Sequence, residues 1–135
     1  MLIKLGHYGC GGVLASMGNH RCGIVDNWLL NIKDVYRSNR PAIEALETPE
    51  ERAALLVELN VKRQVCNIAS SSIVQLAWAA NKPLQIHGWV YDLNTGLLKD
   101  LHHGIGKQSE LPDEIYNIHF EGFLEKMKGL PHVFS

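Results

Sequence analysis

The sequence has no apolar run that approaches the roughly 18 to 20 consecutive residues of a membrane-spanning helix. The apolar part of its start, MLIKLGHYG, is also too short for a secretory signal. An excess of one charge is lacking as well, since 13 lysines and arginines stand against 14 aspartates and glutamates, for a net charge of -1. Because the basic residues are scattered, we expect neither a nucleic-acid nor a membrane partner.

Cysteine is scarce, and the three that occur are Cys10, Cys22 and Cys66. An odd number at these spacings fits no disulfide framework, so we expect reduced thiols in a cytoplasmic protein. Internal repeats and low-complexity segments are absent too. With 135 residues, of which 46% are apolar, the chain is expected to form a single domain over residues 1–135.

The helical pattern is clearest in the middle of the chain. Apolar residues recur at helical spacing over 24–36, and Thr48-Pro49-Glu50-Glu51 combines a capping residue, a proline and a glutamate in the order of a helix start. The pattern then continues to about Ala80, with a break predicted at the serines of 70–72, whose hydroxyls compete for backbone groups. A weaker pattern predicts a terminal helix over 115–127.

Strand-forming residues occur at the start of the chain and after the helical region. MLIKL predicts a first strand, PLQIHGWVY over 83–91 a second, and LLKDL a third that returns antiparallel after the turn at Asn94-Thr95-Gly96. The first two strands enclose a helical crossover and form a βαβ unit. The fold class is therefore α/β, with a short, mostly parallel sheet. One edge of the first strand has no evident partner, which predicts a homodimer or higher oligomer.

The glycine-rich stretch GHYGCGGV places His7 and Cys10 three positions apart, just after the first strand. An imidazole and a thiolate are both good zinc ligands, but a zinc site takes three or four protein ligands, so this pair alone would hold the metal weakly. A strand-to-helix turn without a metal is the other interpretation of this spacing. Possible substitute ligands are His20, Cys22 and the His102-His103 pair, or the same two residues of a second chain.

The same stretch resembles the zinc-binding segment of β-class carbonic anhydrases. The resemblance continues through GIVDNWLLNIKDVY and the run from LNVKRQVCNIASSSIVQLAWAANK to PLQIHGWVYDLNTGLLKDL. It covers residues 1–101 and leaves 102–135 as a divergent tail. It implies reversible hydration of carbon dioxide to bicarbonate at a zinc ion that activates water, with His7 and Cys10 as two ligands. Gly11 and Gly12 belong to the matching motif and would let backbone approach the metal and the bound anion.

One part of the family pattern has no counterpart in this sequence. The family's first cysteine ligand lies in a Cys-x-Asp-x-Arg segment on an earlier strand, and the sequence contains no such segment. The resemblance therefore implies an amino-terminally shortened carbonic anhydrase, whose zinc is weak or absent unless a third ligand is supplied. The alternative is a catalytically inactive homologue or fragment that acts as a structural or interaction module.

Overall fold

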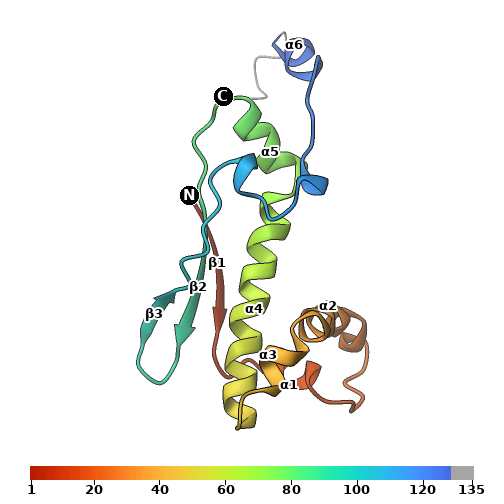
Figure 1. Cartoon of the computed structure of the whole chain (residues 1–135), viewed down its shortest axis with the longest axis vertical. Helices are drawn as coiled ribbons and strands as arrows, with labels where there is room; N and C mark the ends of the chain where they lie inside the picture. The colour runs from red at the N-terminus through yellow and green to blue at the C-terminus, as the bar shows by residue number, and fades with distance from the viewer. Residues whose placement is uncertain (129–135) are drawn as a thin grey trace.

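A computed structural model describes residues 1–128 of the chain, and it places a small sheet against one long helix (Figure 1). The sheet has the order β1-β2-β3, with β1 (Leu2–His7) parallel to β2 (Ile86–Asp92) and β3 (Leu97–Asp100) antiparallel to β2. The long helix, α4 (Pro49–Ala69), belongs to the crossover between β1 and β2. This arrangement confirms the α/β class and the predicted hairpin, with one parallel and one antiparallel pair of strands.

The shorter elements lie at the two ends of α4 (Figure 1). Those before it are α1 (Gly11–Ser16), α2 (Val25–Ser38) and α3 (Arg40–Glu44), and α5 (Ser72–Ala79) follows it. After the sheet come two 3₁₀ turns, η1 (Gln108–Glu110) and η2 (Glu114–Tyr116), and the short α6 (Phe123–Met127). No helix within residues 1–128 is long and apolar enough to cross a membrane.

Both ends of α4 are set by local sequence, as predicted. Thr48 Oγ1 accepts from the Glu51 backbone N–H at 3.1 Å, and the Glu51 side chain accepts from the Thr48 N–H at 3.2 Å, which forms a capping box. At the other end, the hydroxyls of Ser70 and Ser71 donate to the carbonyls of Cys66 and Ile68, each at 2.7 Å. These bonds accompany the break between α4 and α5.

Two glycines allow α4 to pack closely on the sheet. A Cβ at Gly6 would lie 2.6 Å from Val61 Cγ2, and a Cβ at Gly88 would lie 3.1 Å from Val65 Cγ2. The α4 face at this contact, including Val57, is buried, and so is Val90 of β2. The core therefore lies between the sheet and α4, and it holds the end of β1 in a fixed position.

The predicted terminal helix over 115–127 is wrong over most of its length. Within this range the α-helix is limited to α6 (Phe123–Met127), Ile115 and Tyr116 belong to the 3₁₀ turn η2, and the Ile115 side chain is 80% exposed. The cause is tertiary: the buried side chain of Gln75 accepts from the Ile118 N–H at 2.8 Å and donates to the Tyr116 carbonyl at 2.7 Å. Gln108 adds a bond to the Ile118 carbonyl at 3.0 Å. These side chains satisfy backbone groups that a helix would otherwise pair internally.

Candidate metal centre

His7 and Cys10 lie on either side of a tight turn at the end of β1. His7 is the last residue of the strand and is exposed, whereas Cys10 immediately precedes α1 and is half-buried. Between them Gly9 has a φ of +69°, a left-handed conformation that glycine adopts without steric cost. The two side chains line the same pocket, which has a volume of about 520 Å³. The turn thus brings both predicted donors to one place.

The pocket lies along the free edge of β1 and is walled by α2 and α4. Ile32 of α2 and Val57 of α4 supply apolar wall, while Asn60 and Gln64 of α4 supply amides. Asn60 Oδ1 is buried and has no hydrogen-bond partner within residues 1–128. The pocket therefore combines apolar wall with amide groups that are able to bind a small polar molecule.

The orientation of the His7 ring suits a metal ligand. In the tautomer that carries its proton on Nδ1, His7 donates to the Tyr8 carbonyl at 3.0 Å. Its Nε2 lone pair is then available to a cation, and a backbone carbonyl is a common partner for the second nitrogen of a zinc-bound histidine. The donor types, an imidazole nitrogen and a thiol sulfur, fit zinc.

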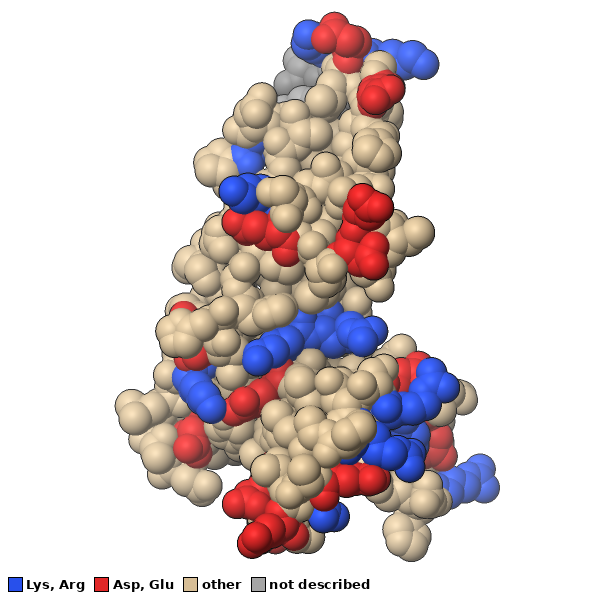
Figure 2. All heavy atoms as spheres, viewed as in Figure 1, with Lys and Arg blue, Asp and Glu red and all other residues tan. Residues whose placement is uncertain are grey.

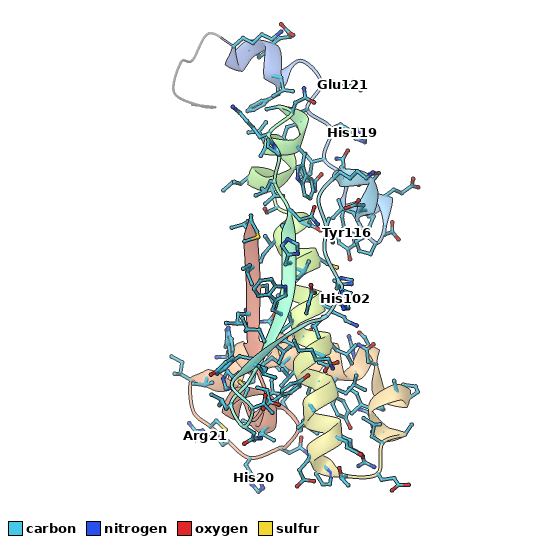
Figure 3. All side chains as sticks on the ribbon, turned by 90° about the vertical axis from the view of Figure 1, so that its left-hand side faces the viewer. His20, Arg21, His102, Tyr116, His119 and Glu121 are labelled. Carbon is cyan, nitrogen blue, oxygen red and sulfur yellow. The ribbon has the colours of Figure 1, made fainter. Side chains whose placement is uncertain are left out.

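The donor number fits zinc only in part. Over residues 1–128 the structure gathers no group of three His, Cys, Asp or Glu side chains that could hold a metal ion. His20 and Cys22 lie on the exposed loop after α1 and are not among the residues that line the pocket, and Figure 3 shows His20 at the outer tip of that loop. The His102 side chain is 88% exposed, and His103 contacts Cys66. Within the described residues, His7 and Cys10 are therefore the two candidate zinc donors that line this pocket.

Gly11 and Gly12 directly follow Cys10, and neither position is so crowded that only glycine would fit. A Cβ at Gly11 would meet no atom within 4 Å. A Cβ at Gly12 would lie 3.5 Å from the Trp28 ring and 3.9 Å from Cys10 Sγ, which are ordinary van der Waals distances. A role for these glycines in the approach of a metal or anion stays a prediction.

A hydrogen-bonded anchor next to His7 was not found from the sequence. The Tyr8 hydroxyl donates to Glu58 Oε1 of α4, and Lys99 Nζ of β3 donates to the same oxygen at 2.7 Å. Glu58 is 50 residues from Tyr8 and 41 from Lys99, so no local pattern signals their contact. The anchor ties the turn that carries His7 to both α4 and the sheet.

The pKa shifts in this anchor reflect its shared carboxylate. Although burial opposes the change, hydrogen bonds from Lys99 and Tyr8 lower the pKa of Glu58 below its ordinary value of 4.5. Burial, together with the Glu58 carboxylate, raises the pKa of Tyr8, and the same carboxylate raises the pKa of Lys99. At neutral pH the three groups are therefore a phenol, a carboxylate and an ammonium ion.

Known proteins resemble this chain over most of its length. A sequence model described as "Carbonic anhydrase" matches residues 1–98. A carbonic anhydrase of Emericella nidulans is 42% identical over 100 residues, which are 74% of this chain and 44% of the relative. One of Saccharomyces cerevisiae is 31% identical over 105 residues, which are 73% of this chain and 47% of the relative.

Solved structures show the same similarity. The Coccomyxa β-carbonic anhydrase in complex with acetazolamide superposes with a TM-score of 0.76 at 32% identity, over 92% of this chain and 57% of its own. A tetrameric β-carbonic anhydrase of Sordaria macrospora gives a TM-score of 0.71 at 28% identity, over 77% of this chain and 53% of its own. The chain thus spans about half the length of these relatives.

Proposed function

Because the chain belongs to the β-class carbonic anhydrase family, we propose that it takes part in the reversible hydration of carbon dioxide to bicarbonate at a zinc ion. His7 and Cys10 are the two ligands that this chain contributes. The observation that carries the proposal is their common position on one pocket, with His7 Nδ1 facing the Tyr8 carbonyl. When bound, zinc supplies a Lewis acid that makes water a good nucleophile near neutral pH.

The protein's own groups have defined tasks in this proposal. The Tyr8 carbonyl holds the imidazole of His7 so that Nε2 is directed away from the backbone. The glutamate anchor beneath Tyr8 limits movement of the turn. Asn60 and Gln64 offer amide groups to a small polar substrate or product in the pocket, while Val57 and Ile32 supply apolar wall.

Two protein ligands are too few for a zinc site, which takes three or four. Residues 1–128 of one chain gather no group of three donors, so the remaining ligand must come from another segment or another chain. If His7 and Cys10 of two copies share one metal, the set is two histidines and two cysteines. Such a tetrahedral site is closed, and without an open position it stabilises a dimer and does not catalyse. If another segment or chain supplies one further ligand, an open position remains for water.

Zinc stoichiometry separates these arrangements. We expect purified protein to bind about one zinc per chain and to hydrate carbon dioxide in stopped-flow assays, and His7→Ala or Cys10→Ala to abolish both. Cys66→Ser is the matched control, because Cys66 lines a different pocket. Loss of zinc in Cys22→Ser or His20→Gln would identify the missing ligand. Half a zinc per chain without activity would indicate the closed shared site.

A structural or interaction module is the second candidate function. It is favoured by the two-ligand set and by β1, an edge strand on which Leu2, Ile3 and Leu5 are 42%, 41% and 51% exposed. We include a homodimer or higher oligomer in both candidates, since exposed apolar edge strands commonly pair. The three cysteines of the chain are free thiols, which suits a cytoplasmic location. No zinc, no activity and a dimer in sedimentation would select the module.

A further inference from the structure

A second cysteine–histidine contact lies apart from the candidate metal centre. Cys66 Sγ of α4 is 3.5 Å from His103 Nε2, in the segment that follows β3, and both residues are half-buried. The family model ends at residue 98, so His103 lies outside the matched region. A thiol within hydrogen-bond distance of an imidazole is the arrangement by which a base activates a sulfur nucleophile.

This pair opens onto its own pocket, of about 380 Å³, which lies within the size range of small-molecule sites. The pocket shares only Asn67 with the larger one at His7 and Cys10. Lys62 and Arg63 of α4 line it beside Cys66, with Asp113 as its acidic residue. Figure 2 shows basic side chains gathered across the middle of the face that α4 crosses in Figure 1. The local charge favours an anionic ligand.

Burial leaves both members of the pair uncharged at neutral pH, so attack by the Cys66 sulfur requires transfer of its proton to His103. Burial raises the pKa of the Cys66 thiol, although Arg63 opposes the change. Burial, with a contribution from Lys62, lowers the pKa of His103. At neutral pH the sulfur therefore keeps its proton, and the uncharged imidazole is free to accept it.

A metal site explains the surroundings less well. The 3.5 Å separation would suit two zinc ligands, but within residues 1–128 no third His, Cys, Asp or Glu completes a set with them. Lys62 and Arg63 would also repel a divalent cation in the same pocket. A small anion that reacts with sulfur meets neither objection.

We propose that Cys66 is a thiolation site, at which His103 acts as the base and the pocket takes a small anionic disulfide of the glutathione type. The Cys66 proton passes to His103 Nε2, and the sulfur attacks the disulfide. One sulfur–sulfur bond forms as the other breaks, and the departing thiolate takes the proton from the imidazolium. The products are one mixed disulfide and one free thiol, so the disulfide itself is the oxidant.

The test compares two disulfides on the reduced full chain. Protein is incubated with oxidised glutathione or with the uncharged 2-hydroxyethyl disulfide, and mass spectrometry of peptides follows Cys66 and, as internal reference, the exposed Cys22. We expect faster reaction of Cys66 with oxidised glutathione than with the neutral reagent, relative to Cys22. Lys62→Gln should reduce this preference about two- to fivefold, the effect of one partly exposed charge.

His103→Gln tests the base. It should slow thiolation of Cys66 by at least about tenfold while leaving Cys22 unchanged, and added imidazole should restore part of the rate. The rescue separates loss of a base from a disturbed fold, which circular dichroism monitors in parallel. Equal rates in His103→Gln and the wild type, or a Cys66 that stays free while Cys22 reacts, would overturn the proposal. So would zinc that protects Cys66 in a chain carrying His7→Ala and Cys10→Ala, because that result assigns a metal site.

Discussion

Replacing Glu58 with glutamine should loosen the turn that carries His7. The Tyr8 hydroxyl and Lys99 Nζ both donate to Glu58 Oε1, and the Glu58 side chain is only 20% exposed. Glutamine keeps the size and an acceptor oxygen, so a charged hydrogen bond becomes a neutral one at a cost of about 1 kcal/mol. Loss of the ion pair, in which Lys99 is 57% exposed, adds about 0.2–1 kcal/mol. The free energy of unfolding should fall by about 1–2 kcal/mol.

The effect should depend on pH with a defined sign. The pKa of Glu58 is lowered in the folded chain relative to its ordinary 4.5. Its contribution is therefore fully present well above pH 4.5 and is lost as the pH falls through the lower, folded value. The difference between wild type and Glu58→Gln should be largest at neutral pH and should shrink as the carboxyl group of the wild type becomes protonated.

Urea unfolding followed by circular dichroism measures this difference. With a slope of about 2 kcal/mol per molar urea, the midpoint at pH 7 should drop by about 0.5–1 M. Glu47→Gln is the control, because Glu47 is exposed before α4 and lacks the two donors. Tyr8→Phe should show a similar loss that is not additive with Glu58→Gln. An equal stability difference at pH 7 and at pH 3, or full additivity, would refute the anchor.

Three further substitutions test the fold around the site. Gly6→Ala should lower the free energy of unfolding by about 1–3 kcal/mol, measured by heat or urea, because the added Cβ would lie 2.6 Å from Val61 of α4. Gly11→Ala is the control, since a Cβ there meets no atom within 4 Å. Equal losses in the two variants would contradict close packing at Gly6. Gln75→Ala should leave the Ile118 backbone N–H without its partner and lower the free energy of unfolding by about 1–3 kcal/mol. Hydrogen exchange at the Ile118 amide should then accelerate, and unchanged protection of that amide would refute the role of Gln75. Thr48→Ala removes the capping box and should lower the free energy of unfolding by about 1 kcal/mol. An unaltered melting temperature would show that this cap does not stabilise the fold.

Local sequence determined most of the elements before any contact was known. The hydrogen bonds of the capping box at Thr48 and of the Ser70 and Ser71 hydroxyls join residues at most four positions apart. A short stretch of sequence is therefore enough to predict them. The same holds for the hairpin, in which Gly96 has a φ of +72°. These signals suffice for the α/β class, because two strands around a helical crossover have few ways to pair.

The candidate metal centre was predictable in part for the same reason. His7 and Cys10 are three residues apart and share one pocket, whereas the Tyr8–Glu58–Lys99 anchor joins three distant elements. Its members are an ordinary tyrosine, glutamate and lysine with no motif around them.

The segment after the sheet was decided by the tertiary structure. Its apolar spacing predicted a helix over 115–127, yet Gln75 on α5 binds the backbone of Tyr116 and Ile118, and neither residue belongs to an α-helix. The Cys66–His103 contact, too, exists only because this segment returns across α4. Sequence by itself determined the elements whose hydrogen bonds are local. Folding decided which polar side chains meet, because a buried polar group must find a partner wherever the chain brings one.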